Sequence, residues 1–479
     1  MLPTLLVPLL WLAMAYAVPT GPTTSGFAPG TLQRSTLTVP VHANPDYVSG
    51  GAALTAVYER GNMPVPDALA RHTLTRRSAS IVASRSTGSY WLTDIFVGNP
   101  ETPQRIPVII DTATSDLYAS PPAPPLTSHR HPLAEPVTHM NNSWLMTTDT
   151  QFGDKAPNGV PTLYDPSKST TSQEIPGATW SSSYGPSILS GHGPIEATDH
   201  LTIADGVTNS GKVYLDTVRF GLLTDNHRFN IVNATVQSVV KVDQRWAVEP
   251  KVSGVLGLAK KRPSSVQPRT PSMLDRLKPE LHFEWIGIDL RHNSDKGFFS
   301  FGYSMGTADI NEKPMDDDDD WSFLVTKTRL STMSGGVWYK FAQPFVATVD
   351  TGSSFLLLPS SLVVKYYSEI PDSAFDPDLQ HYIFPCSLAS GIPDFQFITA
   401  GGYLGTVPRD HINLGPVPGN TEKCYGGIQK STDGQRAIFG GVALKNMYVQ
   451  LNYGTQGSYV GFGDKGSLDV CSTTSVCDT

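Results

Sequence analysis

The sequence predicts an all-β protein with few short helices, built from two similar halves. Glycine and proline are frequent, at 42 and 39 of 479 residues, whereas segments with helical periodicity are few. Short alternating apolar segments that end in turn residues are typical of many short strands. One strand-and-turn motif occurs twice, at residues 110–115 (IDTATS) and 349–354 (VDTGSS). A chain of this length is expected to form two or three domains.

Residues 1–17 are predicted to be a secretory signal peptide. Residues 5–15 are apolar, and Ala15 and Ala17 supply the small side chains that a signal peptidase requires. The alternative is a membrane anchor, but this stretch is too short to span a bilayer. No later segment is long and apolar enough to span one, so we expect a secreted protein without membrane association. A vacuolar destination is the alternative.

Residues 18–77 are predicted to be a propeptide. They are rich in Pro, Thr, Gly and Ala, contain one helical stretch at 52–60, and end at the dibasic pair Arg76 and Arg77. A disordered N-terminus is the alternative interpretation. We favour a propeptide because a signal peptide precedes it and a strand pattern follows it, which makes Ser78 the expected first residue of the mature chain.

The strand pattern begins at residues 90–98, which alternate and lead into a turn at Asn99 and Pro100. Residues 105–110 form the next predicted strand and end at Asp111. Residues 180–184 are predicted to be a strand that ends in a turn at Gly185 and Pro186, which indicates a hairpin.

Charge and surface motifs restrict the possible partners. The net charge is −8, without a basic stripe, which argues against nucleic acid as a partner. Two glycosylation sequons, at Asn141 and Asn233, fit a secreted chain.

The four cysteines lie in the last hundred residues and can pair in three ways. The most local choice pairs Cys386 with Cys424 and Cys471 with Cys477. By closing a loop, the first bridge would lower the entropy of the unfolded chain and so stabilise the folded protein by about 4 kcal/mol. The cysteine spacings match no metal-ligand pattern, and we expect no metal and no cofactor.

Several motifs together carry a family resemblance. They are residues 64–67 (PVPD), 98–100 (GNP), 254–259 (GVLGLA), 297–302 (GFFSFG), 382–386 (YIFPC), 424–429 (CYGGIQ) and 438–440 (IFG). The chain resembles the pepsin-like aspartic proteases, and within them the secreted penicillopepsin type, over most of residues 50–465. In that family, segments like 382–386 and 424–429 carry a disulfide of the C-terminal lobe.

The resemblance implies a bilobal fold, with a cleft between two lobes related by a pseudo-twofold axis. The N-terminal catalytic lobe would span residues 85–300, with an exposed insertion at about 121–160. The C-terminal catalytic lobe would span 301–465, and residues 466–479 would be a polar tail.

Asp111 and Asp350 are the candidate catalytic residues because they stand in the two copies of the motif. Two carboxylates that share one site cannot both ionise easily, so the pair holds one proton. The charged carboxylate can then take a proton from water, while the protonated one donates to the peptide carbonyl oxygen.

The resemblance implies supporting roles for further residues. Thr112 and Thr351 would hold the two aspartate loops together, and Thr114 and Ser353 would offer hydroxyl groups to the carboxylates. Tyr184 stands at the position of the tyrosine of the family's flap, which covers bound substrate. Gly185 in the flap and Gly352 beside the aspartates complete the predicted substrate-binding residues.

Five residues depart from the family pattern. Ala113 replaces a glycine that lets backbone and substrate approach closely. Pro186 replaces a flap residue whose N–H bonds the substrate, and proline has no such donor. Ser187 replaces a flap glycine, Tyr118 a supporting tryptophan, and Gly441 an aspartate near the pair, whose charge would influence how the pair titrates.

These residues predict a monomeric, secreted acid endopeptidase made as a zymogen. Its expected partners are protein or peptide substrates and pepstatin-type inhibitors. Two alternatives remain. One is a pseudoprotease whose cleft binds a peptide or ligand without cleaving it. The other applies the carboxyl pair to a non-peptide substrate.

Overall fold

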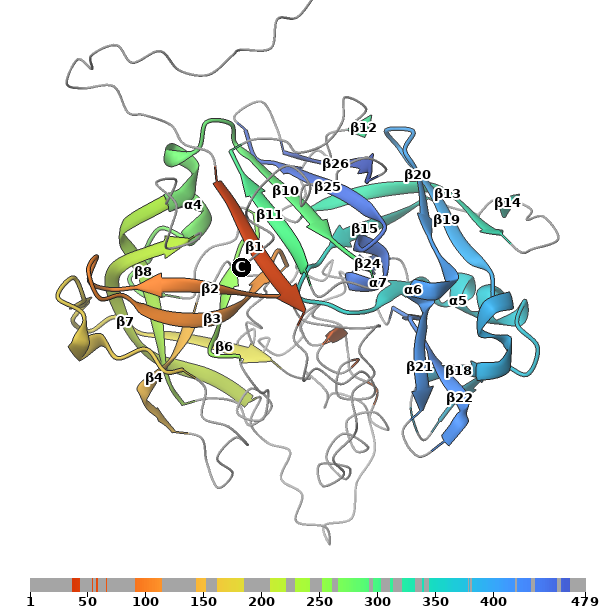
Figure 1. Ribbon diagram of the computed structural model, residues 1–479, viewed down its shortest axis with the longest axis horizontal. Helices are drawn as coiled ribbons and strands as arrows, with labels where there is room; N and C mark the ends of the chain where they lie inside the picture. The colour runs from red at the N-terminus through yellow and green to blue at the C-terminus, as the bar shows by residue number, and fades with distance from the viewer. Residues whose placement is uncertain are drawn as a thin grey trace, which may run out of the picture. The chain divides into compact units, whose positions relative to one another are not determined.

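The computed structural model describes 21 stretches of the chain, and every structural statement below refers to them. They are residues 37–43, 54, 57–58, 66, 91–113, 144–151, 162–184, 207–220, 229–241, 252–260, 266–292, 296–302, 311–312, 321–331, 338–339, 344–377, 379, 381–417, 420–431, 436–454 and 458–465. They belong to one compact unit, 34–479. Strands dominate it and helices are short, which confirms the predicted all-β class (Figure 1).

The largest sheet joins strands from both ends of the described chain. Its members are β1 (Leu37–Ala43), β2 (Trp91–Val97), β3 (Gln104–Asp111), β4 (Trp144–Gln151), β5 (Gln173–Glu174), β6 (Trp180–Tyr184), β7 (Val207–Phe220), β8 (Phe229–Lys241), β9 (Gly254–Gly257), β10 (Trp285–Leu290), β11 (Lys296–Phe301), β12 (Asn311–Glu312), β25 (Met447–Asn452) and β26 (Tyr459–Asp464). The strand order is β12-β26-β25-β10-β11-β1-β2-β3-β9-β4-β8-β7-β5, and β6 pairs with β7.

Two further sheets lie in the second half of the sequence. One has the order β20-β19-β13-β15-β24-β16-β23, with β14 on β13, and the other has the order β17-β18-β22-β21. Their bounds are β13 (Ser322–Ser331), β14 (Trp338–Tyr339), β15 (Phe345–Val349), β16 (Leu356–Leu358), β17 (Ala374–Asp376), β18 (His381–Pro385), β19 (Asp394–Thr399), β20 (Leu404–Val407), β21 (Asn413–Val417), β22 (Asn420–Gly426), β23 (Ile428–Lys430) and β24 (Arg436–Phe439).

The α-helices in the described stretches are short, with four to nine residues each. They are α4 (Met273–Leu277), α5 (Ser360–Ser368), α6 (Arg409–Ile412) and α7 (Gly441–Leu444), with 3-10 turns η1 (Pro166–Lys168), η2 (Lys278–Glu280) and η3 (Cys386–Gly391). In the described stretches, none of these helices is long and apolar enough to cross a membrane.

Side-chain periodicity explains how these elements bury the core. In β19, Phe395 and Phe397 are fully buried, while Gln396 between them is partly exposed. This is expected when alternate side chains face one side of a sheet. In α5, Leu362 and Tyr366 are four residues apart and both are buried, so one face of the helix packs inward.

The two copies of the aspartate motif are built by the same strand pairing. Strand β3 pairs in parallel with β9, where Asp111 lies opposite Gly257. Strand β15 pairs in parallel with β24, where Val349, directly before Asp350, lies opposite Phe439. Each aspartate therefore follows a buried strand that is fixed by a parallel neighbour, and the two halves are similar at this level.

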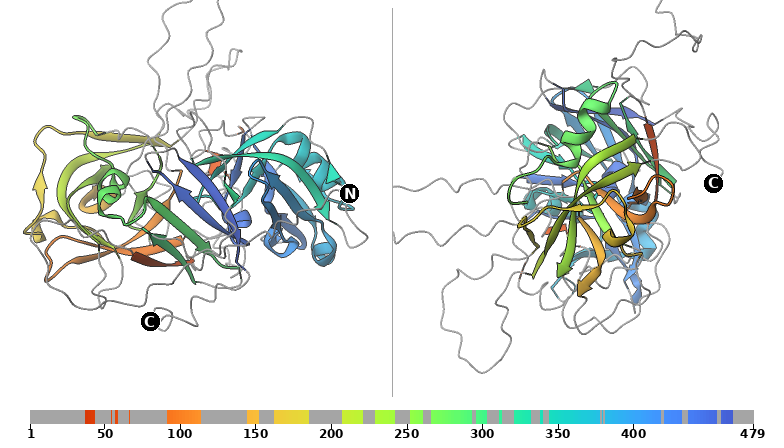
Figure 2. Two further views of the ribbon diagram at one scale, coloured as in Figure 1. Left: turned by 90° about the horizontal axis from the view of Figure 1, so that it is seen from above. Right: turned by 90° about the vertical axis from the view of Figure 1, so that its left-hand side faces the viewer.

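One strand was not predicted. Strand β1 lies inside the predicted propeptide and inserts between β11 and β2 (red in Figures 1 and 2). Six of its residues pair with β11, and Val39 and Val41 are buried. The signal for this strand in the sequence is weak because β1 is short and contains a proline, and its main partner lies far along the chain.

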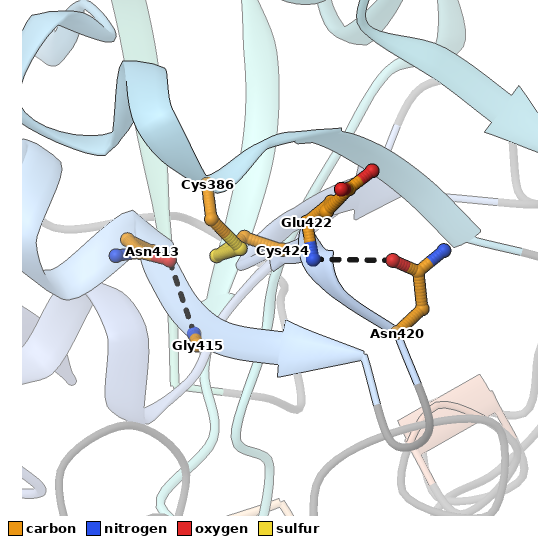
Figure 3. The surroundings of a disulfide bond; sticks show 6 residues. All are labelled: Cys386, Asn413, Gly415, Asn420, Glu422 and Cys424. Carbon is orange, nitrogen blue, oxygen red and sulfur yellow. Dashed lines mark hydrogen bonds between the residues drawn. A yellow bond between two sulfur atoms is a disulfide. The ribbon is translucent and has the colours of Figure 1, made fainter.

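The disulfide between Cys386 and Cys424 confirms one of the predicted pairs (Figure 3). The Sγ atoms are 2.02 Å apart, and the bridge joins the start of η3 to β22. Cys471 and Cys477 lie outside the described residues.

Candidate active site

Asp111 is the last residue of β3, and its side chain is only 3% exposed. Its carbonyl oxygen accepts from the Leu258 amide at 2.8 Å, which anchors the turn to the segment that follows β9. The Ala113 amide donates to Asp111 Oδ1 at 2.9 Å. The alanine at this position therefore keeps the backbone hydrogen bond to the carboxylate.

Asp350 follows β15 and is 1% exposed. Its amide donates to the Phe439 carbonyl at 3.1 Å. The Gly352 amide donates to Asp350 Oδ1 at 2.9 Å, and the Ser353 hydroxyl donates to Oδ2. Both carboxylate oxygens thus have donors from the same turn, an arrangement that stabilises the charged form.

A reciprocal set of hydrogen bonds joins the two aspartate turns. The Thr112 amide donates to Thr351 Oγ1 at 3.2 Å, and the Thr351 amide donates to Thr112 Oγ1 at 3.1 Å. In turn, Thr112 Oγ1 donates to the Val349 carbonyl at 2.9 Å and Thr351 Oγ1 to the Ile110 carbonyl at 2.8 Å. Both threonines are buried, so these bonds hold the turns in a fixed relation.

The glycine after Thr351 shows how closely the turns approach. A Cβ atom placed on Gly352 would lie 2.4 Å from Asp111 Oδ2 and 2.5 Å from Asp111 Cγ. Neither distance is possible for a real side chain, so only glycine fits here without displacing the carboxylate. The structure therefore brings Asp111 and the Asp350 turn into direct contact.

Helix α7 supports the Asp350 turn from the other side. The Gly440 and Gly441 amides donate to the carbonyls of Phe355 at 3.0 Å and Ser353 at 2.7 Å, and the Val442 amide donates to Ser354 at 2.9 Å. A Cβ on Gly441 would meet only ordinary contacts, the nearest at 3.6 Å, so the site has room for a side chain.

A second supporting contact was not expected from the sequence. The Trp321 indole Nε1 donates to the Leu258 carbonyl at 2.8 Å, and Leu258 in turn holds Asp111. Trp321 is fully buried directly before β13. No motif marks it, and only the folded chain brings it beside the first aspartate turn.

The predicted flap is only partly described. Tyr184 is the final residue of β6 and pairs with Val207 on β7. Gly185, Pro186 and Ser187 lie outside the described residues. Thr114, Tyr118 and Asn141 do so as well. Asn233 is exposed on β8 and has a left-handed backbone, with φ at 55°.

No group of three or more His, Cys, Asp or Glu side chains in the described stretches is placed to hold a metal ion. At this site the described residues bring together two carboxyl groups with hydroxyl and amide donors.

Comparison with known proteins assigns the chain to a family. A family model described as "Eukaryotic aspartyl protease" matches residues 195–464. Endothiapepsin of Cryphonectria parasitica is 28% identical over 446 residues, covering 88% of each chain. Penicillopepsin-1 of Penicillium janthinellum is 30% identical over 324 residues, covering 67% of this chain and 87% of its own. Aspergillopepsin-1 of Aspergillus oryzae is 30% identical over 325 residues, covering 67% and 72%. The chain therefore belongs to the eukaryotic aspartyl proteases, a family of aspartic-type endopeptidases.

Proposed function

We propose that this protein is a secreted aspartic endopeptidase in which Asp111 and Asp350 share one proton and activate a water molecule. The observation that carries the proposal is the reciprocal bonding of Thr112 and Thr351, which joins the turns of two buried aspartates. Enforced proximity of like charges keeps the pair singly protonated near its working pH.

The same hydrogen bonds suggest how the reaction proceeds. The charged carboxylate removes a proton from water, which attacks the carbonyl carbon of the peptide. The protonated carboxyl group donates to the carbonyl oxygen, and the pair later returns a proton to the leaving amine. The Ala113 and Gly352 amides and the Ser353 hydroxyl hold the carboxylate oxygens in place during these transfers.

Replacement of Asp350 tests this proposal. We expect the purified, processed protein to cleave peptides in a mixed library between about pH 3 and 7, with inhibition by pepstatin. We expect Asp350→Asn to abolish cleavage, because an amide can neither take nor give the required proton. Near-ultraviolet circular dichroism would establish that the variant is folded. A folded parent protein that cleaves nothing at any pH would contradict the proposal and favour a pseudoprotease.

We further propose that residues 1–17 are a signal peptide and that 18–77 are a propeptide held against the enzyme before activation. Two contacts support this. Strand β1 occupies an interior position of the largest sheet, and the helical residue Tyr58 is buried and donates from its hydroxyl group to the Lys430 carbonyl at 2.8 Å. The proposed propeptide therefore contacts the rest of the protein through β1 and through Tyr58.

N-terminal sequencing tests the processing. The active, secreted protein is expected to begin at Ser78, after the dibasic pair Arg76 and Arg77. An active protein that still carries β1 in a continuous chain would contradict the proposed cut. The same preparation, treated with an N-glycosidase, is expected to lose mass from Asn233, whose side chain is exposed.

The proposed substrates are proteins or peptides with bulky apolar residues on both sides of the cleaved bond. The protein is proposed to act as a monomer. Tyr184 is proposed to cover the substrate, because it ends β6 where the chain passes into residues 185–206, which connect β6 to β7.

A further inference from the structure

Ala113 gives the two aspartates different surroundings. The hydrogen bonds that join the turns obey a local twofold relation, in which Thr112 corresponds to Thr351. The bonds within the turns obey it as well, since the amides of Ala113 and Gly352 donate at 2.9 Å to Oδ1 of their own aspartates. Residue 113 therefore faces Asp350 as residue 352 faces Asp111.

The space around Gly352 shows what a methyl group does at this position. A Cβ there would lie 2.4 Å from Asp111 Oδ2, well inside the distance at which a carbon and an oxygen atom touch. On the Ala113 side such a methyl group is present. Because the relation between the turns is fixed by four buried hydrogen bonds, the neighbouring carboxyl group must adjust to the methyl group.

We propose that the Ala113 methyl group packs against the Asp350 carboxyl group, keeps water from it, and so makes Ala113 a positioning residue that sets the acid limit of the site. This inference rests on the proposed function, because the limit is expressed through the shared proton of the pair.

Two physical effects act in the same direction on the acid limit. A methyl group in place of a hydrogen removes water from the carboxylate, which disfavours its charged form. A carboxyl group displaced from its partner also shares the remaining proton less well. The singly protonated pair is then less stable, so the doubly protonated pair loses its first proton only at higher pH. Both effects move the formation of the doubly protonated, inactive pair to higher pH.

Among the described residues, groups from the Asp111 turn, from its own turn and from α7 lie around the Asp350 turn. Asp111 faces it across the interface, and its own turn supplies the Gly352 amide and the Ser353 hydroxyl. Helix α7 presents Gly441, which brings no charge. The methyl group of Ala113 is thus one difference between the two turns, because the matching position in the Asp350 turn is Gly352.

The test compares Ala113→Gly with the parent protein. We expect the acid limb of the pH profile of kcat/KM to move down by about one pH unit in Ala113→Gly. The matched control is Ala437→Gly, which removes a buried methyl group from β24 without facing either carboxyl group and is expected to leave the acid limb in place. Circular dichroism at each pH separates titration from unfolding.

A second readout does not depend on turnover. Carbon-13 NMR of protein labelled at aspartate Cγ, with Asp350→Asn to identify the signal, gives the apparent midpoint of the pair's titration as seen at Asp350. We expect this midpoint to fall in Ala113→Gly by the same amount as the acid limb. Coincident midpoints in the parent and Ala113→Gly would overturn the inference. A parent that cleaves nothing counts against the proposed function alone, since the NMR titration still decides whether the methyl group acts on Asp350.

Discussion

Acidification from about pH 7 to about pH 4 is expected to lower the free energy of unfolding by about 3 kcal/mol through His411. His411 is 5% exposed and stacks on His292, with ring centroids 3.9 Å apart. The pKa of His411 is lowered to about 3, mainly by burial and to a smaller degree by the neighbouring His292 and Lys445, while a hydrogen bond with the Val442 backbone opposes the shift.

The groups around His292 and His411 offer little free negative charge to stabilise a proton added to either ring. Burial and Lys445 lower the pKa of His292, with a smaller opposite effect from Asp410. The pKa of Lys445 is lowered to about 8, by burial and by Lys465, so this lysine is charged in acid. Asp289, a buried acid three residues before His292, already pairs with Lys465 and with Arg291.

The sign of the effect follows from the pKa of His411 in the two states. Its pKa is about 3 in the folded protein and about 6.5 in the unfolded chain, so the unfolded chain binds the extra proton between these values. The stability contribution is complete above about pH 6.5 and is lost as the pH falls toward 3. Because α6 carries His411 and contacts α7, which supports the Asp350 turn, the loss reaches the site.

Urea unfolding at several pH values measures this effect. His411→Gln is expected to flatten the loss of stability in acid, because glutamine does not titrate. The matched control is His282→Gln, which changes an exposed histidine and is expected to keep the parent's pH dependence. Equal slopes for the parent and His411→Gln would show that the stacked pair does not limit acid stability.

The features predicted well from the sequence are those that neighbouring residues determine. The strand that ends at Asp111 was placed almost to the residue because its apolar run stops at a charged turn. The turn at 351–352 was predictable because the motif contains the glycine that close approach requires. The pairing of Cys386 with Cys424 agreed with the most local choice.

The features that were missed depend on contacts between distant parts of the chain. Strand β1 is stabilised by β11, and Trp321 reaches Leu258, although neither segment carries a local signal for its partner. The stacked pair of His292 and His411 joins the segment after β10 to α6 in the same way. A single sequence shows residue types and spacing, but the surroundings of a buried polar group arise only when the chain is folded.

Asp216→Ala is expected to lower the free energy of unfolding by roughly 3 to 5 kcal/mol. Asp216 is 1% exposed and accepts hydrogen bonds from Tyr164 Oη at 2.6 Å, Ser169 Oγ at 3.0 Å, Thr171 Oγ1 and the Thr217 amide at 2.7 Å. Burial and this carboxylate both raise the pKa of Tyr164. Alanine would remove the acceptor that these four donors share, leaving Tyr164 only the longer bond to Ser172, and Ser169 and Thr171 only the longer bond to each other.

The contrast with a surface acid separates this role from a general effect of charge. Asp94 pairs with Arg105, whose side chain is 70% exposed, so Asp94→Ala is expected to cost at most about 1 kcal/mol. Asp216→Asn keeps the shape of the side chain but turns one acceptor into a donor, and it is expected to fall between the two alanine variants. Urea denaturation at neutral pH ranks all three.

Because Asp216 lies on β7, the strand that pairs with β6 as far as Tyr184, a large loss would show that the predicted flap is built on a rigid, polar support. Equal stability of Asp216→Ala and Asp94→Ala would instead mean that the four donors find other acceptors, and that this carboxylate does not hold the base of the hairpin.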